Sequence, residues 1–121
     1  MSKLPLEYLK HIIEETTFIL TKVNEVSEDN FYNDATLKRA IVRSLEIIGE
    51  ASKNIPASFK ERNADIDWKN TARMRDKLIH HYFGIDYSIV WDIIKNEIPS
   101  LHGKITVLLQ NEEKKANLAG N

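Results

Sequence analysis

The chain has 121 residues, of which 42% are apolar and 29% charged, and its formal net charge is −1. This length suits one domain with its own core, and the absence of cysteine excludes disulfides and thiolate metal sites. No apolar run approaches the ~20 residues of a transmembrane helix and no secretory signal opens the chain, so we expect a cytoplasmic protein without membrane contact.

Apolar residues recur at helical spacing along the first half of the chain. A first long helix is expected after Pro5, and the polar run 27–30 interrupts the pattern, with Phe31 turned inward. Asn33 can cap a second long helix, Asp34 is also a candidate cap at this helix start, and Pro56 ends the helix. The predicted inner faces are Leu6, Leu9, Ile12, Ile13, Thr16, Leu20 and Val23 in the first helix, and Leu37, Ile41, Leu45, Ile48, Ser52 and Ile55 in the second.

The second half of the chain continues the helical pattern. Asp67 is a good cap for a third helix that carries Trp68 and is expected to run on to Gly84. Asp86 caps a fourth helix, and Pro99 should kink or break it before a last helix begins. The two tryptophans, Trp68 and Trp91, fall on apolar stripes and are expected to anchor the core.

No alternating strand pattern of useful length competes with this helical periodicity. We therefore expect an all-α, single-domain, up-and-down bundle of four to five helices over residues 1–111, followed by a frayed polar tail over 112–121. A glycine inside a helix costs about 1 kcal/mol relative to alanine. Gly49 therefore predicts a close contact between the second helix and a neighbour.

The residues with chemical potential gather at the end of the third helix. On an ideal helix Asp76 and His80 are four positions apart and share a face, so the carboxylate could orient the imidazole. Arg75 and His80 are five positions apart, which turns them about 140° from each other. One helix alone therefore makes a poor Arg–His site, whereas two copies meeting across a symmetry axis could make a better one.

A structural explanation competes for each of these residues. Cations near a helix C-terminus favour the helix dipole and can bind its last carbonyl groups. Nothing distinguishes His81 from a surface or capping histidine, and Tyr82 fits a half-buried ring with its hydroxyl at the surface. His11 and His102 stand alone in the sequence and are expected to be structural or exposed.

The pattern Arg-x4-His-x-Tyr at Arg75, His80 and Tyr82 resembles the motif of the HepT family, part of the wider HEPN group of helical RNA-processing proteins. The flanking blocks also match over nearly the whole chain. They are Ile47-Ile48-Gly49-Glu50-Ala51, Ile66-Asp67-Trp68, Met74-Arg75 and Val90-Trp91. The chain departs from the family pattern at His81, where a small residue such as glycine is expected, so a second imidazole stands beside the site.

The resemblance implies a metal-independent endoribonuclease with no cofactor, in which the 2′-hydroxyl of the RNA attacks the adjacent phosphate. Histidine suits proton transfer near neutral pH, so His80 would perform the acid–base work, with Asp76 and His81 in support. Arginine suits the charge that develops on phosphorus, so Arg75 would stabilise the transition state. The family builds this site at a homodimer interface, in agreement with the helical geometry above.

The resemblance gives Tyr82 a separate role. In this type of toxin–antitoxin pair the partner is a minimal nucleotidyltransferase that transfers AMP groups to the tyrosine and silences the nuclease. Phosphodiester groups two residues from His80 would block RNA by both volume and charge. Tyr82 would have to be accessible for this modification.

Two stripes of basic residues are candidate RNA contacts. Lys69, Arg73 and Lys77 recur every four residues on the third helix, and Arg39 and Arg43 do so on the second. Such stripes can hold phosphates without sequence preference. A solvated helix face is the competing interpretation, because nearby aspartates dilute the charge.

Two other functions remain open from the sequence. The first is a non-catalytic module that binds a nucleotide, or scaffolds a nucleotidyltransferase, and in which Arg75 and His80 hold a phosphate without cleaving anything. The second is a purely structural helical dimer. Substitution of Arg75 or His80 would abolish cleavage in a nuclease, weaken binding in a module, and change nothing beyond stability in a structural dimer.

Overall fold

The computed structural model describes residues 4–79 and 84–119, and within them the chain forms an all-α bundle, as the periodicity predicts. The described residues form eight helices. They are α1 (Leu4–Val23), α2 (Glu28–Tyr32), α3 (Ala35–Asn54), α4 (Ala57–Arg62), α5 (Trp68–Ala72), α6 (Met74–Leu78), α7 (Tyr87–Asn96) and α8 (Ile98–Ala119). No helix among them is long and apolar enough to cross a membrane.

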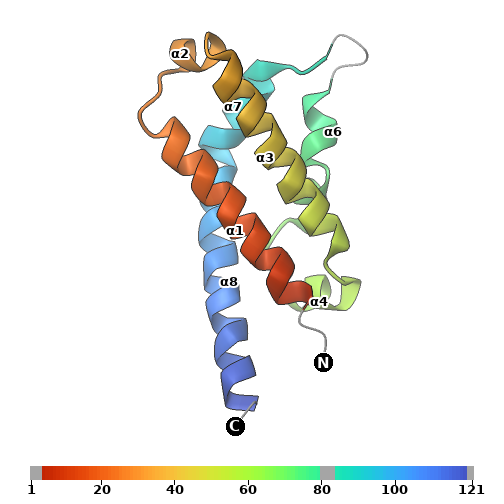
Figure 1. The fold of residues 1–121 in the computed structure, drawn as a ribbon. Helices are drawn as coiled ribbons and strands as arrows, with labels where there is room; N and C mark the ends of the chain where they lie inside the picture. Colours follow the sequence, from red (N-terminus) through yellow and green to blue (C-terminus); the bar gives the residue numbers. More distant parts are fainter. Residues whose placement is uncertain (1–3, 80–83, 120–121) are drawn as a thin grey trace.

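The helices run up and down in four segments (Figure 1). The α1 helix ascends, α3 descends beside it, α5 and α6 together ascend, and α7 and α8 descend in succession. The α3 helix is central, since it packs against α1, α5 and α6, while α8 packs against α1 and α7. The predicted third helix is thus divided into α5 and α6, while the predicted fourth and last helices correspond to α7 and α8.

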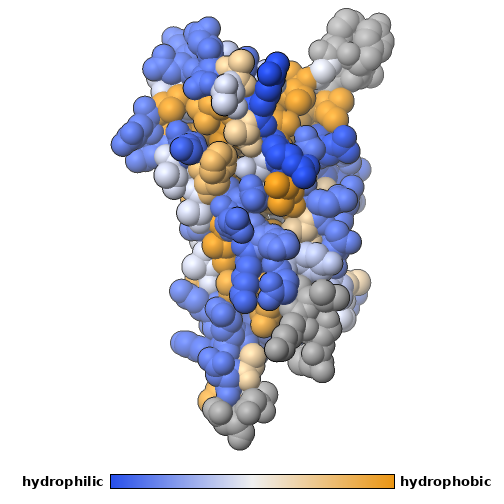
Figure 2. Space-filling view, viewed as in Figure 1, coloured by the Kyte–Doolittle hydropathy of each residue, from blue (hydrophilic) through white to orange (hydrophobic). Residues whose placement is uncertain are grey.

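The inner faces of the two long N-terminal helices lie largely where the sequence predicts them. Leu9, Ile12 and Thr16 of α1 are fully buried, as are Ile41 and Leu45 of α3. Figure 2 shows hydrophilic side chains over much of the face formed by α1 and α3, with apolar atoms exposed between them. Burial of the stripes against each other supplies the main driving force for the bundle.

The helix caps confirm most of the sequence pattern and correct one residue. Asp67 accepts from the backbone N–H of Asn70, and Asp86 caps α7 in the same way. Of the two candidate caps of α3, Asp34 is confirmed, since its carboxylate accepts from Leu37 N at 2.9 Å, and the expectation that Asn33 caps this helix is wrong. An extra short helix, α2, uses Asn33 as its C-terminal cap and turns Phe31 fully into the core, as predicted.

The expected third helix is shorter than predicted and has a break. A turn at Arg73 separates α5 from α6, and α6 ends at Leu78 rather than continuing to Gly84. Ile79 is extended and forms an antiparallel bridge with Ile85, while Asp86 N donates to Leu78 O at 2.9 Å. Two β-branched residues in register favour this extended pairing over another helical turn.

The C-terminal half contains two further differences from the prediction. The break between α7 and α8 falls at Glu97, two residues before Pro99, which lies in the first turn of α8, where proline is tolerated. The polar segment after residue 111 was expected to fray, yet α8 continues through it to Ala119.

Gly49 makes the close helix contact that the sequence predicts. A Cβ atom at this position would lie 3.3 Å from the carbonyl oxygen of Ala72, which is closer than ordinary van der Waals contact. Glycine thus lets α3 approach the junction of α5 and α6. Glu46 lies three residues before Gly49 on α3, and Arg75 lies three residues after Ala72, on α6. Because α3 and α6 run in opposite directions (Figure 1), Glu46 and Arg75 lie at the same height along the two helices.

Candidate functional site

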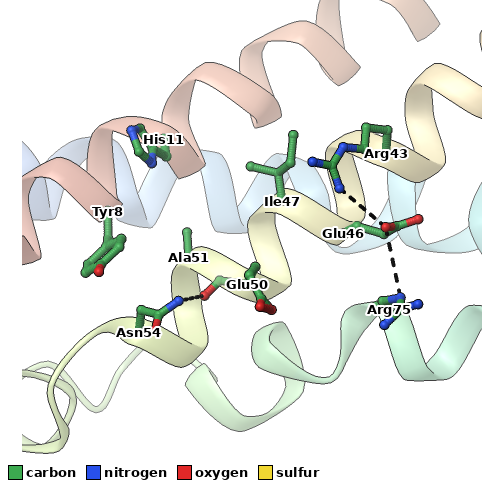
Figure 3. A pocket seen from close by; sticks show the side chains of 9 residues that line it. All are labelled: Tyr8, His11, Arg43, Glu46, Ile47, Glu50, Ala51, Asn54 and Arg75. Carbon is green, nitrogen blue, oxygen red and sulfur yellow. Dashed lines mark hydrogen bonds and ion pairs between the residues drawn. The ribbon is translucent and has the colours of Figure 1, made fainter.

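Arg75 lines a pocket of about 530 Å³ between three helices. Tyr8 and His11 come from α1, a longer row of side chains comes from α3, and Arg75 comes from α6 (Figure 3). The α3 residues are Arg43, Glu46, Ile47, Glu50, Ala51 and Asn54. The pocket therefore joins one residue of the predicted motif to residues far away in the sequence.

Two arginines converge on one carboxylate in this pocket. Nη1 of Arg43 lies 3.5 Å from Oε2 of Glu46, and Nε of Arg75 lies 4.0 Å from the same oxygen. The arginine side chains are 70% and 61% exposed, so both remain open to solvent. Exposed ion pairs at such distances contribute little stability, roughly 0–1 kcal/mol. The arrangement brings two permanent positive charges together at an accessible surface.

The histidines differ in their surroundings. His11 is exposed and packs edge-on against Tyr8, with ring centroids 6.5 Å apart and planes at 82°. His102 instead hydrogen-bonds the fully buried Thr16, with 2.8 Å between Nδ1 and Oγ1, so its role is structural, as expected. His11 is exposed, also as expected, but its position in the same pocket as Arg75 was not anticipated.

Three residues of the predicted site, His80, His81 and Tyr82, lie outside the described residues. The chain on either side of them is defined, since the Ile79–Ile85 bridge holds the two flanks together. Gly84 adopts a φ of +94°, a conformation that favours glycine. Ile79 and Ile85, on the two sides of the undescribed residues, are therefore adjacent just beyond the last turn of α6.

The prediction that Asp76 and His80 share one helix face assumed a continuous helix, and this assumption is wrong because α6 ends at Leu78. The four-residue spacing places both on one face only if the helix continues past His80. The same correction applies to the angle of about 140° between Arg75 and His80, which assumed a continuous helix. Asp76 itself is exposed and lies in a second pocket, apart from the one that holds Arg75.

This second pocket, of about 500 Å³, brings the basic stripe of the motif region together. Lys69, Arg73 and Lys77 all line it despite the break at Arg73, and Asp67 and Asp76 line it too. Lys69 and Arg73 are exposed. Arg43 lines the first pocket, whereas Arg39 is an exposed residue one helical turn away that lines neither of these two pockets.

Lys77 is already engaged within the protein. Its ammonium lies 3.5 Å from Oε1 of Glu97 and hydrogen-bonds Oδ1 of Asn70. Asn70 in turn donates to the same Glu97 oxygen at 2.6 Å. This three-residue network links α5 and α6 to the junction of α7 and α8, so Lys77 has a structural role that Lys69 and Arg73 do not share.

The described residues contain no cluster of three or more His, Asp or Glu side chains placed to hold a metal ion. Among them, the pocket residues that the sequence did not identify are Tyr8, His11, Glu46 and Asn54. Nothing in the local sequence of α1 distinguishes His11, because its link to Arg75 arises only from packing of α1 against α3. The block at 47–51 that resembles the family signature lies one residue from Glu46 and was the nearest available signal.

Comparison with known proteins identifies the family. Residues 6–108 match the family model described as ribonuclease HepT-like. A candidate RNase of Caldanaerobacter subterraneus is 49% identical over 111 residues, which cover 92% of this chain and 99% of the relative. A probable ribonuclease HepT of Thermococcus cleftensis is 47% identical over 84% of this chain and 93% of its own, and a candidate RNase of Methanocaldococcus jannaschii is 42% identical over 88% of each.

No solved structure gives a significant match. The family model covers most of the chain, and the relatives are similar over nearly their full lengths. The motif block Arg75-x4-His80-x-Tyr82 lies within the matched region. The chain belongs to the HepT-like ribonuclease family.

Proposed function

We propose that the protein is the toxin of a type VII, HepT/MntA-type toxin–antitoxin pair and cleaves RNA as a metal-independent endoribonuclease. The observation that carries this proposal is the solvent-accessible guanidinium of Arg75, in a pocket with a second arginine, within a chain of the HepT-like ribonuclease family. An arginine fork can bind two oxygens of a phosphate, and it stays charged at every physiological pH.

In the proposed reaction the RNA supplies its own nucleophile. The 2′-hydroxyl loses its proton to a base, its oxygen forms a bond to the adjacent phosphorus, and the bond from phosphorus to the 5′-oxygen breaks. The departing oxygen takes up a proton, which leaves a 2′,3′-cyclic phosphate and a 5′-hydroxyl. His80 is the proposed proton carrier, with His81 as a supporting group. Arg75 would stabilise the additional negative charge on the phosphoryl oxygens.

A homodimer would complete this site. On one chain the Arg75 side chain is 61% exposed, so water would screen its charge strongly. Electrostatic stabilisation is larger where water is excluded. Ile79, four residues after Arg75 in the sequence, is 43% exposed and would offer apolar surface to a second copy.

Regulation is proposed to act on Tyr82. A cognate minimal nucleotidyltransferase would attach AMP groups to its phenolic oxygen, adding negative charge and volume close to His80. In the sequence Tyr82 lies between Ile79 and Ile85, and the bridge between these two residues stands just beyond the end of α6, the helix that carries Arg75. Modified protein would therefore repel the RNA phosphate.

The test is RNA cleavage in EDTA by protein whose intact mass shows no AMP, beside Arg75→Ala and His80→Ala. We expect wild-type cleavage that leaves cyclic-phosphate ends, and a loss of at least ~100-fold in each variant. Arg75→Ala should melt at the wild-type temperature because the side chain is exposed. Absence of cleavage by unmodified wild-type protein would contradict the proposal and favour a nucleotide- or partner-binding module.

A further inference from the structure

We propose that the pocket between α1, α3 and α6 is a subsite for one nucleotide of single-stranded RNA, next to the phosphate that is cleaved. In this subsite Arg43 is a second phosphate-binding cation beside Arg75, and Tyr8 and His11 border the space for the base and ribose. The inference rests on the proposed ribonuclease activity and specifies how its substrate is held.

The two ends of the pocket differ in the same way as the two ends of a nucleotide: one end is charged, and the other carries rings and amide groups. Figure 3 shows Arg43 and Arg75 at one end of it, on either side of Glu46, and Tyr8 and Asn54 at the other. A nucleotide carries its negative charge at the phosphate and its ring at the opposite end. The arginine end matches the phosphate, while the aromatic and amide groups of the far end match a base, which stacks on rings and bonds to amides.

The arginines can bind a phosphate beside their present partner. Each contacts Glu46 through one carboxylate oxygen, at 3.5 and 4.0 Å, and each is more than half exposed. Such pairs are weak, whereas a phosphodiester presents two charged oxygens to which two guanidinium groups can bind together. Glu46 thus keeps both cations near one point, where a phosphate can bind the guanidinium nitrogens that do not face the carboxylate.

The dimensions of the pocket also suit one nucleotide. Its volume of about 530 Å³ falls within the ~300–1,000 Å³ typical of small-molecule sites. Ile47 is half-buried and Ala51 is buried, and both supply an apolar wall against which a base can lie. His11 is exposed, and its ring is nearly perpendicular to that of Tyr8. The two rings therefore do not stack face to face, which leaves aromatic surface that a base could contact.

The experiment measures binding separately from cleavage. The probe is a fluorescein-labelled tetranucleotide with 2′-O-methyl groups, which has no free 2′-hydroxyl and so cannot be cleaved. Its affinity is measured by anisotropy at several salt concentrations for wild type, Arg43→Ala and Lys53→Ala. Lys53 is a matched control, since it is an exposed cation on the same helix that does not line the pocket.

We expect Arg43→Ala to weaken binding about ten-fold, the usual effect of one charge-assisted phosphate contact. The slope of log affinity against log salt should fall by about 0.7, as for the loss of one contact to a single strand. Lys53→Ala should change affinity by less than about two-fold. In a 4-thiouridine version of the probe, ultraviolet crosslinks should map to α1 at Tyr8 or His11.

Two outcomes would overturn the subsite: no binding by wild type, or equal effects of Arg43→Ala and Lys53→Ala. If wild-type protein cleaves RNA in either case, the proposed ribonuclease stands while the subsite fails. If wild type binds the probe with the expected dependence on Arg43 yet never cleaves RNA, the subsite stands and the proposed activity fails. Melting curves of both variants confirm that a loss of affinity is not a loss of fold.

Discussion

Glu46 of α3 and Arg75 of α6 face each other across the candidate site, with Oε2 of the carboxylate 4.0 Å from Nε of the guanidinium. The contact depends on Gly49, which brings α3 against the junction that precedes α6. Glu46 also lies 3.5 Å from Arg43, so one carboxylate sits between two cations. Its exposed partners make this contact a weak source of stability, and we expect Glu46 to act by orienting Arg75.

The first prediction concerns Glu46→Gln, which keeps the shape of the side chain and removes its charge. We expect kcat to fall about three- to ten-fold because the guanidinium of Arg75 is held less firmly. KM for RNA should stay the same or fall, since a negative charge leaves a pocket that would receive phosphate. Steady-state kinetics on a short RNA would separate the two constants.

Glu14→Gln is the control for this experiment, because Glu14 is an exposed carboxylate on α1 that does not line the pocket. It should leave both constants at wild-type values. A rise in KM with unchanged kcat in Glu46→Gln would show that Glu46 contributes to substrate binding and not to the position of Arg75.

The bundle could be predicted from the sequence because burial follows periodicity. Leu9 and Ile12 on α1, and Ile41 and Leu45 on α3, are fully buried at predicted positions. The breaks were harder to predict, since neither Arg73 nor Glu97 is a residue that interrupts helices by itself. The end of α6 at Leu78 depends on pairing of Ile79 with Ile85, a contact across a return of the chain that helical spacing does not contain.

Of the residues that line the candidate pocket, the sequence identified as catalytic only Arg75, which belongs to the Arg-x4-His-x-Tyr motif. Arg75 was identified from the resemblance of its segment to the family. The partners of Arg75 come from α1 and α3, and their arrival depends on how three helices pack. His11 carries no local signal, and Glu46 looks like any polar residue on an amphipathic helix. Such residues become recognisable once it is known how the antiparallel helices α3 and α6 are aligned with each other.

The second prediction concerns the basic residues of the second pocket. The double substitution Lys69→Ala with Arg73→Ala should weaken RNA binding several-fold and flatten its salt dependence, because both side chains are exposed cations. Lys77→Ala should affect affinity less, since Lys77 is already paired with Glu97 and Asn70. Anisotropy titrations at several salt concentrations would compare them. Equal losses in all variants would indicate that Lys77 exchanges its internal partners for phosphate.

The third prediction compares two glycines within helices. At Gly49→Val the new side chain meets the backbone carbonyl of Ala72, which cannot rotate away, so we expect a loss of about 1–3 kcal/mol in the free energy of unfolding. At Gly103→Ala an added Cβ meets no heavy atom within 4 Å, so helix propensity should raise stability by up to about 1 kcal/mol. Urea denaturation would measure both, and destabilisation by Gly103→Ala would contradict the packing described for α8.

The last prediction tests whether the site is shared between two copies. If each site takes Arg75 from one chain and His80 from the other, Arg75→Ala and His80→Ala should each be inactive alone. Refolded together in equal amounts, they should recover about a quarter of wild-type activity, because half of the dimers are mixed and each mixed dimer has one complete site of two. If both residues act within one chain, no mixed dimer contains a complete site and the mixture stays inactive. Light scattering must first show that wild type is dimeric, since a monomer with full cleavage activity would contradict the shared site directly.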